Sequence, residues 1–406
     1  MSAATACRHS KKPPNTTYFP LILMRVGFFS DTYYPNVDGV VTAMMTYRRE
    51  LERRGDKVYI FAAKPSGADT SDKSVFFYDS VAFPPYPQYR LAIFPYMLTS
   101  KARRAKLDLV HSHAITTMGL ASIKAARDLK VPLVGTFHTM VPIAAKYYTR
   151  KNPVARFLAD KLLWGSIKTF YSPFQLVTAP TKVICDILEA QGIEKTFRVP
   201  NGVDTARFSP KVDPTPVRKI LGIKPGEKVI MSAGRVSLEK EIPVIVRACK
   251  QLEEDGEDFR LVITGDGPAF KSVKKLVSEL GLSDRTVMPG FCRPYELPFY
   301  YAAADVYVTA STFETQGLAM LEAMSCGKPV VGANSLAIPE TVKDNYNGYL
   351  FDPHNHFDCA TKISKVINAS PARRAALSKA ARRTAEGLSI EKSTDRLLEA
   401  YSLVMK

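Results

Sequence analysis

Cysteine is scarce in this chain: six residues among 406, with no CxxC pair and no histidine at metal-binding spacing. The six are Cys7, Cys185, Cys249, Cys292, Cys326 and Cys359. Scattered cysteines of this kind are typical of reduced thiols in the cytoplasm rather than of a disulfide scaffold or a zinc site. We therefore expect a cytoplasmic protein with no disulfide bond and no structural zinc.

Long apolar runs are also missing. The most apolar stretch near the start, residues 18–29, is interrupted by Arg25 and falls short of the roughly 20 apolar residues that a membrane span needs. It predicts a strand instead, and the residues before it lack the apolar core of a signal peptide. Because Met24 opens this strand, residues 1–23 are expected to be a disordered tail or an artefact of the assigned start.

Acidic residues are outnumbered, with 39 Asp and Glu against 56 Lys and Arg and a net charge of +17. This imbalance indicates attraction to a polyanion, such as nucleic acid, an anionic membrane or a diphosphate ligand, without choosing among them. The basic residues fall into separate clusters around 101–106, 146–168 and 373–383. Such a distribution disfavours a single basic arm.

The chain contains two successive α/β patterns. Its 406 residues are enough for two domains of about 200 residues each. Short apolar runs alternate with helical patterns on both sides of a proline-rich stretch at 200–225, which predicts parallel sheets wound by crossover helices. The expected strands are 25–29, 57–61, 109–111, 133–136, 176–178, 229–231, 261–263, 286–288, 306–308 and 329–331. A helix is expected over 39–54, closed by Gly55. The fold class is thus α/β, with two doubly wound, Rossmann-like domains facing across a cleft.

Two carboxylates, Glu314 and Glu322, follow the strand expected at 306–308. Residues 318–324 are apolar except Glu322, so this carboxylate is unfavourable in a buried helix unless it pairs with a cation or binds a ligand hydroxyl. Glu314 precedes the helix, where Gly317 permits close approach and free N–H groups favour a phosphate. If both were helical they would be about 12 Å apart along the axis, whereas glycosidase pairs lie roughly 5–10 Å apart. The pair therefore predicts binding rather than acid–base catalysis.

Cations and glycines follow two other strands of the second half. Gly234, Arg235 and Lys240 come after the strand at 229–231. A guanidinium and an ammonium together can hold a diphosphate and offset its charge as it leaves, and surface salt bridging is the alternative. The turn that begins at Gly265 resembles a phosphate loop, although it lacks the GxGxxG spacing.

Three histidines lie at expected strand ends in the first half. His111 and His113 end one strand and His138 ends the next, so their side chains are expected to converge at one edge of the sheet. A histidine at a strand end is also a common structural residue. Gly39, in the first strand-to-helix loop, permits close approach to a phosphate or a sugar.

Five motifs, in order, resemble family-4 retaining glycosyltransferases of the GT-B fold, and the resemblance runs from about residue 24 to the end. They are Thr136-Phe137-His138-Thr139, Pro200-Asn201-Gly202-Val203-Asp204, Gly234-Arg235-x4-Lys240, Gly265-Asp266-Gly267-Pro268 and Glu314-x7-Glu322. Residues 29–42 and 111–140 look nearest to the diacylglycerol glucosyltransferases. The resemblance implies an acceptor-side domain over 24–200, a donor domain over 201–385, and a final helix, 386–406, that crosses back to the first domain.

The resemblance also implies a role for each motif. Arg235 and Lys240 would bind the donor diphosphate, and Glu322 the ribose. Glu314 would contact the sugar near the reacting carbon, and His138 would orient the reaction. Further donor-site residues would be Gly39, Asn201, Gly234, Gly265, Gly317 and Leu318.

The implied reaction is hexose transfer with retention of configuration, in which the departing diphosphate accepts the proton of the acceptor hydroxyl. It needs no metal and no cofactor beyond a nucleotide-diphosphate sugar, with a UDP-sugar favoured. Two residues depart from the family pattern: Asp38 where the first of two adjacent glycines is usual, and Glu241 where glycine commonly follows the lysine. Since Asp38 brings negative charge near a diphosphate, its loop either faces elsewhere or contacts the acceptor.

A lipid acceptor such as diacylglycerol is expected from the nearest resemblance. Independently, residues 146–171 interleave six cations with aromatics against one acid, Asp160. This pattern suits an anionic membrane surface, although a core-facing helix with solvated lysines fits it as well. The expected partners are a nucleotide sugar, a lipid and the cytoplasmic face of a membrane, where the protein would be peripheral, but no nucleic acid. The alternatives are the same chemistry on a soluble sugar or sugar phosphate, a nucleic-acid-binding protein, and a non-hydrolysing epimerase, which the Glu-x7-Glu segment disfavours.

Overall fold

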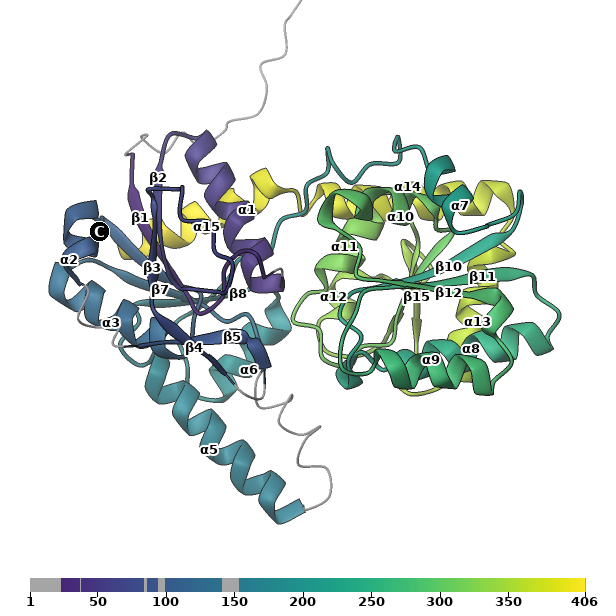
Figure 1. Cartoon of the computed structure of the whole chain (residues 1–406), viewed down its shortest axis with the longest axis horizontal. Coiled ribbons are helices and arrows are strands. Elements are labelled where there is room, and N and C mark those ends of the chain that lie inside the picture. Colours follow the sequence, from purple (N-terminus) through teal and green to yellow (C-terminus); the bar gives the residue numbers. More distant parts are fainter. Residues whose placement is uncertain (1–22, 37, 84–85, 94–98, 141–152, 406) are drawn as a thin grey trace, which may run out of the picture.

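The chain forms two α/β domains that lie side by side (Figure 1). The computed structural model describes residues 23–36, 38–83, 86–93, 99–140 and 153–405. Apart from Leu23, the expected tail at 1–23 lies outside the described residues, as do residues 146–152 of the basic and aromatic segment. The prediction of two doubly wound α/β domains is confirmed by the two parallel sheets.

The first domain is built on a seven-stranded parallel sheet in the order β3-β2-β1-β6-β7-β8-β9. Its strands are β1 (Arg25–Ser30), β2 (Lys57–Ala63), β3 (Val75–Tyr78), β6 (Leu109–Ser112), β7 (Leu133–Thr136), β8 (Leu176–Ala179) and β9 (Thr196–Arg198). Successive residues of β1 point to opposite faces: Phe28 joins one apolar core and Phe29 another. A sheet with a core on each face explains why its strands are apolar throughout.

Helices pack on both sides of this sheet. They are α1 (Gly39–Arg53), α2 (Thr99–Ala105), α3 (Thr117–Leu129), α5 (Pro153–Tyr171) and α6 (Lys182–Ala190). The helix expected over 39–54 is confirmed by α1, and Gly55 follows it with a left-handed φ of 101°. A short antiparallel hairpin of β4 (Ser80–Phe83) and β5 (Tyr86–Ala92) lies apart from the sheet.

The second domain has a six-stranded parallel sheet in the order β12-β11-β10-β13-β14-β15. Its strands are β10 (Lys228–Ala233), β11 (Phe259–Thr264), β12 (Thr286–Gly290), β13 (Val306–Thr309), β14 (Val330–Ala333) and β15 (Gly348–Phe351). Its helices are α7 (Thr215–Ile220), α8 (Ile242–Glu254), α9 (Phe270–Glu279), α10 (Leu297–Ala303), α11 (Leu318–Ser325), α12 (Ile338–Thr341), α13 (His356–Ile367) and α14 (Pro371–Glu386). Chain order reverses between β10 and β13, which is where open α/β sheets bind ligands.

The last helix, α15 (Ile390–Val404), leaves the second domain and packs against α1 of the first. Figure 1 shows it in yellow among the purple elements of the N-terminal half. Leu397, Ala400 and Tyr401 of α15 are fully buried there, in one core with Val26 and Met44. The first domain is therefore completed by the end of the chain.

The described residues can be compared with the expectations for disulfides, metal sites and membrane-spanning helices. The five cysteines within the described residues are all buried and free. In the same part of the chain no group of three or more His, Cys, Asp or Glu side chains is arranged to hold a metal ion. None of the described helices is both long enough and apolar enough to cross a bilayer.

Candidate active site

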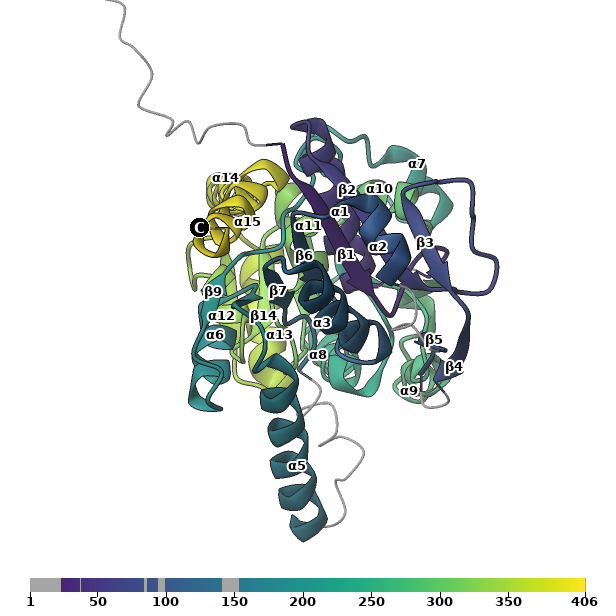
Figure 2. The ribbon, with the colours of Figure 1, turned by 90° about the vertical axis from the view of Figure 1, so that its left-hand side faces the viewer.

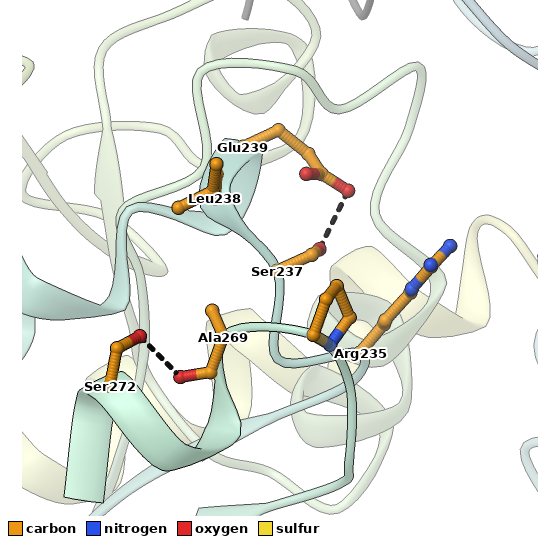
Figure 3. Close-up of a pocket in the computed structure, with 7 residues that line it drawn as sticks. Arg235, Ser237, Leu238, Glu239, Ala269 and Ser272 are labelled. Atoms are coloured by element: carbon orange, nitrogen blue, oxygen red, sulfur yellow. Dashed lines mark hydrogen bonds between the residues drawn. The ribbon is translucent and has the colours of Figure 1, made fainter. Parts of the chain in front are cut away.

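Two glycine-containing loops meet at the switch point of the second sheet. Gly234 follows β10 and Gly265 follows β11, and the backbone of each touches the other: a Cβ on Gly265 would lie 1.9 Å from the Gly234 carbonyl oxygen. The Val236 N–H donates to the Asp266 carbonyl at 3.0 Å, which fixes the two loops together. Beside them lies a cavity of ≈ 180 Å³, lined by Arg235, Ser237, Leu238, Glu239, Pro268, Ala269 and Ser272 (Figure 3). The motif at 265–268 thus packs directly against the motif at 234–240.

Lys240 and Glu314 form an ion pair at this edge. The Lys240 Nζ lies 2.6 Å from Glu314 Oε1, and both side chains are partly buried. Lys240 follows β10 and Glu314 follows β13, so the two come from the neighbouring strands at the reversal of chain order. The predicted cation and the predicted carboxylate are therefore in direct contact, and their partial burial distinguishes them from a fully exposed surface pair. The ammonium has further N–H groups with which it can donate to a phosphate.

Glu322 lies on α11 and is held by a single side chain among the described residues. The Tyr301 hydroxyl donates to Glu322 Oε2 at 2.8 Å. Burial raises the pKa of Glu322 to about 7, against the opposing effects of the Tyr301 hydrogen bond and the charge of Arg207. No described Lys or Arg forms a salt bridge with Glu322, so the internal ion pair weighed from the sequence is absent from this part of the chain.

The start of α11 lies between these two carboxylates in the sequence, and no side chain of the described residues caps its first backbone N–H groups. Gly317 is the N-cap with φ 87°, and no side chain caps the helix. Such a helix start favours an anion or the oxygen atoms of a sugar. Leu318 opens the helix directly after Gly317. The family resemblance implies that both are donor-site residues; in the structure Gly317 ends the loop that carries Glu314, and Leu318 begins the helix.

Asn201 lies where the chain passes from the first domain to the second. The side-chain amide of Gln316 makes two hydrogen bonds to its backbone. The Asn201 N–H donates to Gln316 Oε1 at 2.7 Å, and Gln316 Nε2 donates to the Asn201 carbonyl at 3.1 Å. The Thr315 hydroxyl beside it donates to the His138 carbonyl at 3.1 Å. The loop that carries Glu314 therefore also joins the domains. Gln316 and Thr315 were not predicted as site residues, although they lie between Glu314 and Gly317 in the sequence.

The three histidines do converge, with different roles. Both ring nitrogens of His111 are occupied, by the Tyr401 hydroxyl and the Thr136 hydroxyl, each at 2.7 Å, so His111 is structural. His113 Nδ1 lies 2.9 Å from His138 Nε2. Burial lowers the pKa of His138 to about 4. His138 is therefore neutral near pH 7 and can orient a sugar through hydrogen bonds, but it carries no charge there.

The first loop of the chain faces the second domain. Asp38 is the N-cap of α1, and its Oδ1 accepts from the Val41 N–H at 2.8 Å. Burial raises the pKa of Asp38, while the hydrogen bond from Val41 and the charge of Arg235 partly oppose the rise. A Cβ on Gly39 would meet no atom within 4 Å, so there is open space in front of this helix. Arg235 and Asp38 hence lie in electrostatic range across the cleft.

Comparison with known proteins agrees with this architecture. The family model "Glycosyltransferase Family 4" matches residues 37–207, and "Glycosyl transferases group 1" matches residues 214–384. An alpha-monoglucosyldiacylglycerol synthase of Streptococcus pneumoniae is 31% identical over 362 residues, covering 86% of this chain and 79% of that protein. A D-inositol 3-phosphate glycosyltransferase of Rhodococcus opacus is 29% identical, covering 87% of this chain and 83% of that protein.

Among solved structures, HepE from Anabaena in complex with UDP and glucose superposes with a TM-score of 0.74 at 20% identity, covering 94% of this chain and all of that one. This likeness establishes the fold as GT-B. The two family models and the relative from Streptococcus pneumoniae show that the chain is an enzyme of the hexosyltransferase class. The chain belongs to glycosyltransferase family 4.

Proposed function

We propose that the enzyme transfers a hexose, with retention of configuration and without a metal ion, from a nucleotide-diphosphate sugar to a hydroxyl group of a membrane lipid such as diacylglycerol. The observation that carries the proposal is the contact between Lys240 and Glu314 at the reversal point of the second sheet, where Lys240 shares its loop with Arg235. Cations placed there can offset the charge of a departing diphosphate. HepE, which shares the fold, binds UDP and glucose, and a UDP-sugar is the proposed donor.

Each side chain of this site has a proposed role. Arg235 and Lys240 hold the diphosphate, and Lys240 keeps Glu314 beside the sugar through their 2.6 Å contact. Glu322 accepts from the ribose hydroxyls, and the neutral ring of His138 orients the hexose. As the bond between the sugar and the diphosphate breaks, the acceptor oxygen attacks from the same face. A diphosphate oxygen takes the proton of the acceptor hydroxyl, so that neither carboxylate acts as the base.

A lipid acceptor is supported by an apolar groove between α3 and α5. The groove is a cavity of ≈ 820 Å³ lined by Leu120, Ile123, Leu158, Lys161, Leu162, Gly165, Ser166, Thr169 and Phe170. On α5, which projects beyond the sheet in Figures 1 and 2, Phe157, Leu158 and Leu162 are 68, 52 and 71% exposed. Exposed apolar side chains gathered in this way mark an interaction surface. We therefore propose that α5 rests peripherally on the cytoplasmic face of an anionic membrane, to which the net charge of +17 attracts the protein.

The donor and acceptor are tested together by incubating the enzyme with UDP-glucose, UDP-galactose or GDP-mannose, with and without diacylglycerol vesicles, and measuring nucleotide diphosphate release. Release is expected to be fastest with a UDP-sugar and lipid. Glu322→Ala is expected mainly to raise the donor KM, and His138→Ala mainly to lower kcat. If no donor is turned over and none raises the Tm, the proposed donor chemistry is wrong. Release stimulated by an inositol phosphate instead of lipid would favour a soluble acceptor.

Membrane association predicts that the protein floats with vesicles containing phosphatidylglycerol at low salt. Replacing both Leu158 and Leu162 with serine is expected to weaken vesicle binding at least about tenfold, because each buried leucine side chain contributes about 1.5–3 kcal/mol. Ile220→Ser is the matched control, since Ile220 is 78% exposed but lies on α7 of the other domain. Equal loss in both variants, or no flotation of the unmodified protein, would exclude α5 as the membrane surface.

A further inference from the structure

The buried side chain of Tyr301 contacts the proposed donor-site carboxylate, Glu322, through its hydroxyl group. Tyr301 of α10 is only 1% exposed, and its ring packs edge-on to Phe208 at 5.8 Å and tilted to Tyr307 at 6.1 Å. Its hydroxyl donates to Glu322 Oε2 at 2.8 Å. A buried tyrosine hydroxyl needs a hydrogen-bond partner, and here that partner is the carboxylate assigned to the ribose.

This contact constrains a side chain that would otherwise turn freely. The terminal torsion of a glutamate is broad and roughly two-fold, so an unheld carboxylate would sample many orientations. Because the Tyr301 ring is enclosed by Phe208 and Tyr307, its hydroxyl fixes the position of Oε2. Oε1 and the remaining lone pairs stay available, and a carboxylate has enough of them to accept from two adjacent hydroxyl groups.

We propose that Tyr301 is a positioning residue of the donor site: its hydroxyl holds the Glu322 carboxylate in the orientation that receives the ribose hydroxyls. This inference rests on the proposed donor role of Glu322. Tyr301 itself touches no substrate. It acts through the orientation and the charge of its neighbour.

The charge of Glu322 gives the inference a second readout. The groups that face Glu322 are Tyr301 of α10, Arg207 of the loop after β9, Tyr307 of β13 and Cys326 at the end of α11. Burial raises the pKa of Glu322 to about 7, and the Tyr301 hydrogen bond opposes this rise. Without the hydroxyl the pKa rises further. A larger fraction of Glu322 is then protonated near pH 7, and a protonated carboxyl accepts fewer hydrogen bonds.

The test compares the binding of UDP and 2′-deoxy-UDP by calorimetry in the full-length enzyme. Unmodified protein is expected to prefer UDP about tenfold, as one hydrogen bond to a charged group implies. Tyr301→Phe, which keeps the ring in the core, is expected to lose most of this preference while binding 2′-deoxy-UDP almost unchanged. Lowering the pH should weaken UDP binding in both proteins as Glu322 becomes protonated. In Tyr301→Phe this weakening should begin at a higher pH than in the unmodified protein.

Two further variants separate positioning from a general packing effect. Tyr349 lies on β15 of the same domain, and Tyr349→Phe removes a hydroxyl that bonds to Asn345 and to Arg373. This variant should leave the preference for UDP intact. In a Glu322→Gln background, Tyr301→Phe should have no additional effect. Equal weakening of UDP and 2′-deoxy-UDP in Tyr301→Phe would overturn the inference while leaving the donor proposal standing. Failure of the unmodified enzyme to bind either UDP or GDP would overturn both.

Discussion

Lys240→Ala is expected to lower kcat/KM for the donor sugar by about 10²–10³-fold, which is the effect of removing one group that stabilises developing charge in an enclosed site. The Lys240 ammonium lies 2.6 Å from Glu314 Oε1, and both groups are partly buried. Its removal has two consequences. The departing diphosphate loses a compensating cation, and Glu314 is left as an unpaired carboxylate that repels it.

Steady-state kinetics with varied donor concentration measures this effect, and thermal unfolding checks that the fold is retained. Lys250→Ala is the matched control, because Lys250 of α8 also pairs with a glutamate, Glu253, at 2.8 Å, but away from the reversal point. A pair of that kind contributes about 0–1 kcal/mol. Adding Glu314→Gln to Lys240→Ala should not recover the full rate, since the cation is still missing. A loss of less than about fivefold in Lys240→Ala would argue against a role in stabilising the leaving group.

The strands that build the site were predictable because each is apolar along its length. All ten expected strands are present, from β1 to β14. The missed strands, β3, β9 and β15, have three or four residues and lie at the edges of their sheets. In β9 (Thr196–Arg198) only one residue is apolar, so no apolar run marks the strand. The β4–β5 hairpin was also missed: β5 has seven residues, but prolines at 84, 85 and 87 interrupt the strand pattern.

The contact between Lys240 and Glu314 shows where sequence reasoning ends. The two residues are 74 positions apart, and their meeting depends on β10 and β13 being neighbours in the sheet. The general rule that ligands bind where chain order reverses predicts a shared edge. It does not predict which side chains touch there. The pairing needs the strand order and the turn of each loop.

Asp38 illustrates a different limit. From the sequence alone, Asp38 is expected to be unfavourable because it brings a negative charge near a diphosphate. In the structure it has extended backbone angles, φ −136° and ψ 178°, and caps α1 through Val41, as aspartate commonly does before a helix. Tyr301 was overlooked because it lies in the largely apolar run 297–304 and reads as a core residue, which it also is. Its hydroxyl becomes informative only beside Glu322.

Leu397→Ala is expected to destabilise the first domain by about 2–5 kcal/mol, although the residue lies nine positions before the last residue of the chain. Leu397 is 0% exposed and belongs to the core that includes Val26 and Met44. Leu403→Ala, on the same helix but 49% exposed, should cost less than about 0.5 kcal/mol. Urea denaturation followed by intrinsic fluorescence and circular dichroism measures both variants, and coincident transitions are the condition for comparing them as single values.

The same substitution also tests how α15 joins the two domains. Tyr401, one turn beyond Leu397, bonds to His111. Loosening α15 should therefore also loosen the end of β6, which carries His111. At 20 °C, where the fold is still populated, Leu397→Ala should keep most of its kcat, because none of the proposed donor groups lies on α15. On heating, activity and the first-domain signal should fall together. If activity instead survives the loss of that signal, the donor domain works without the first domain, and the proposed role of His138 is wrong.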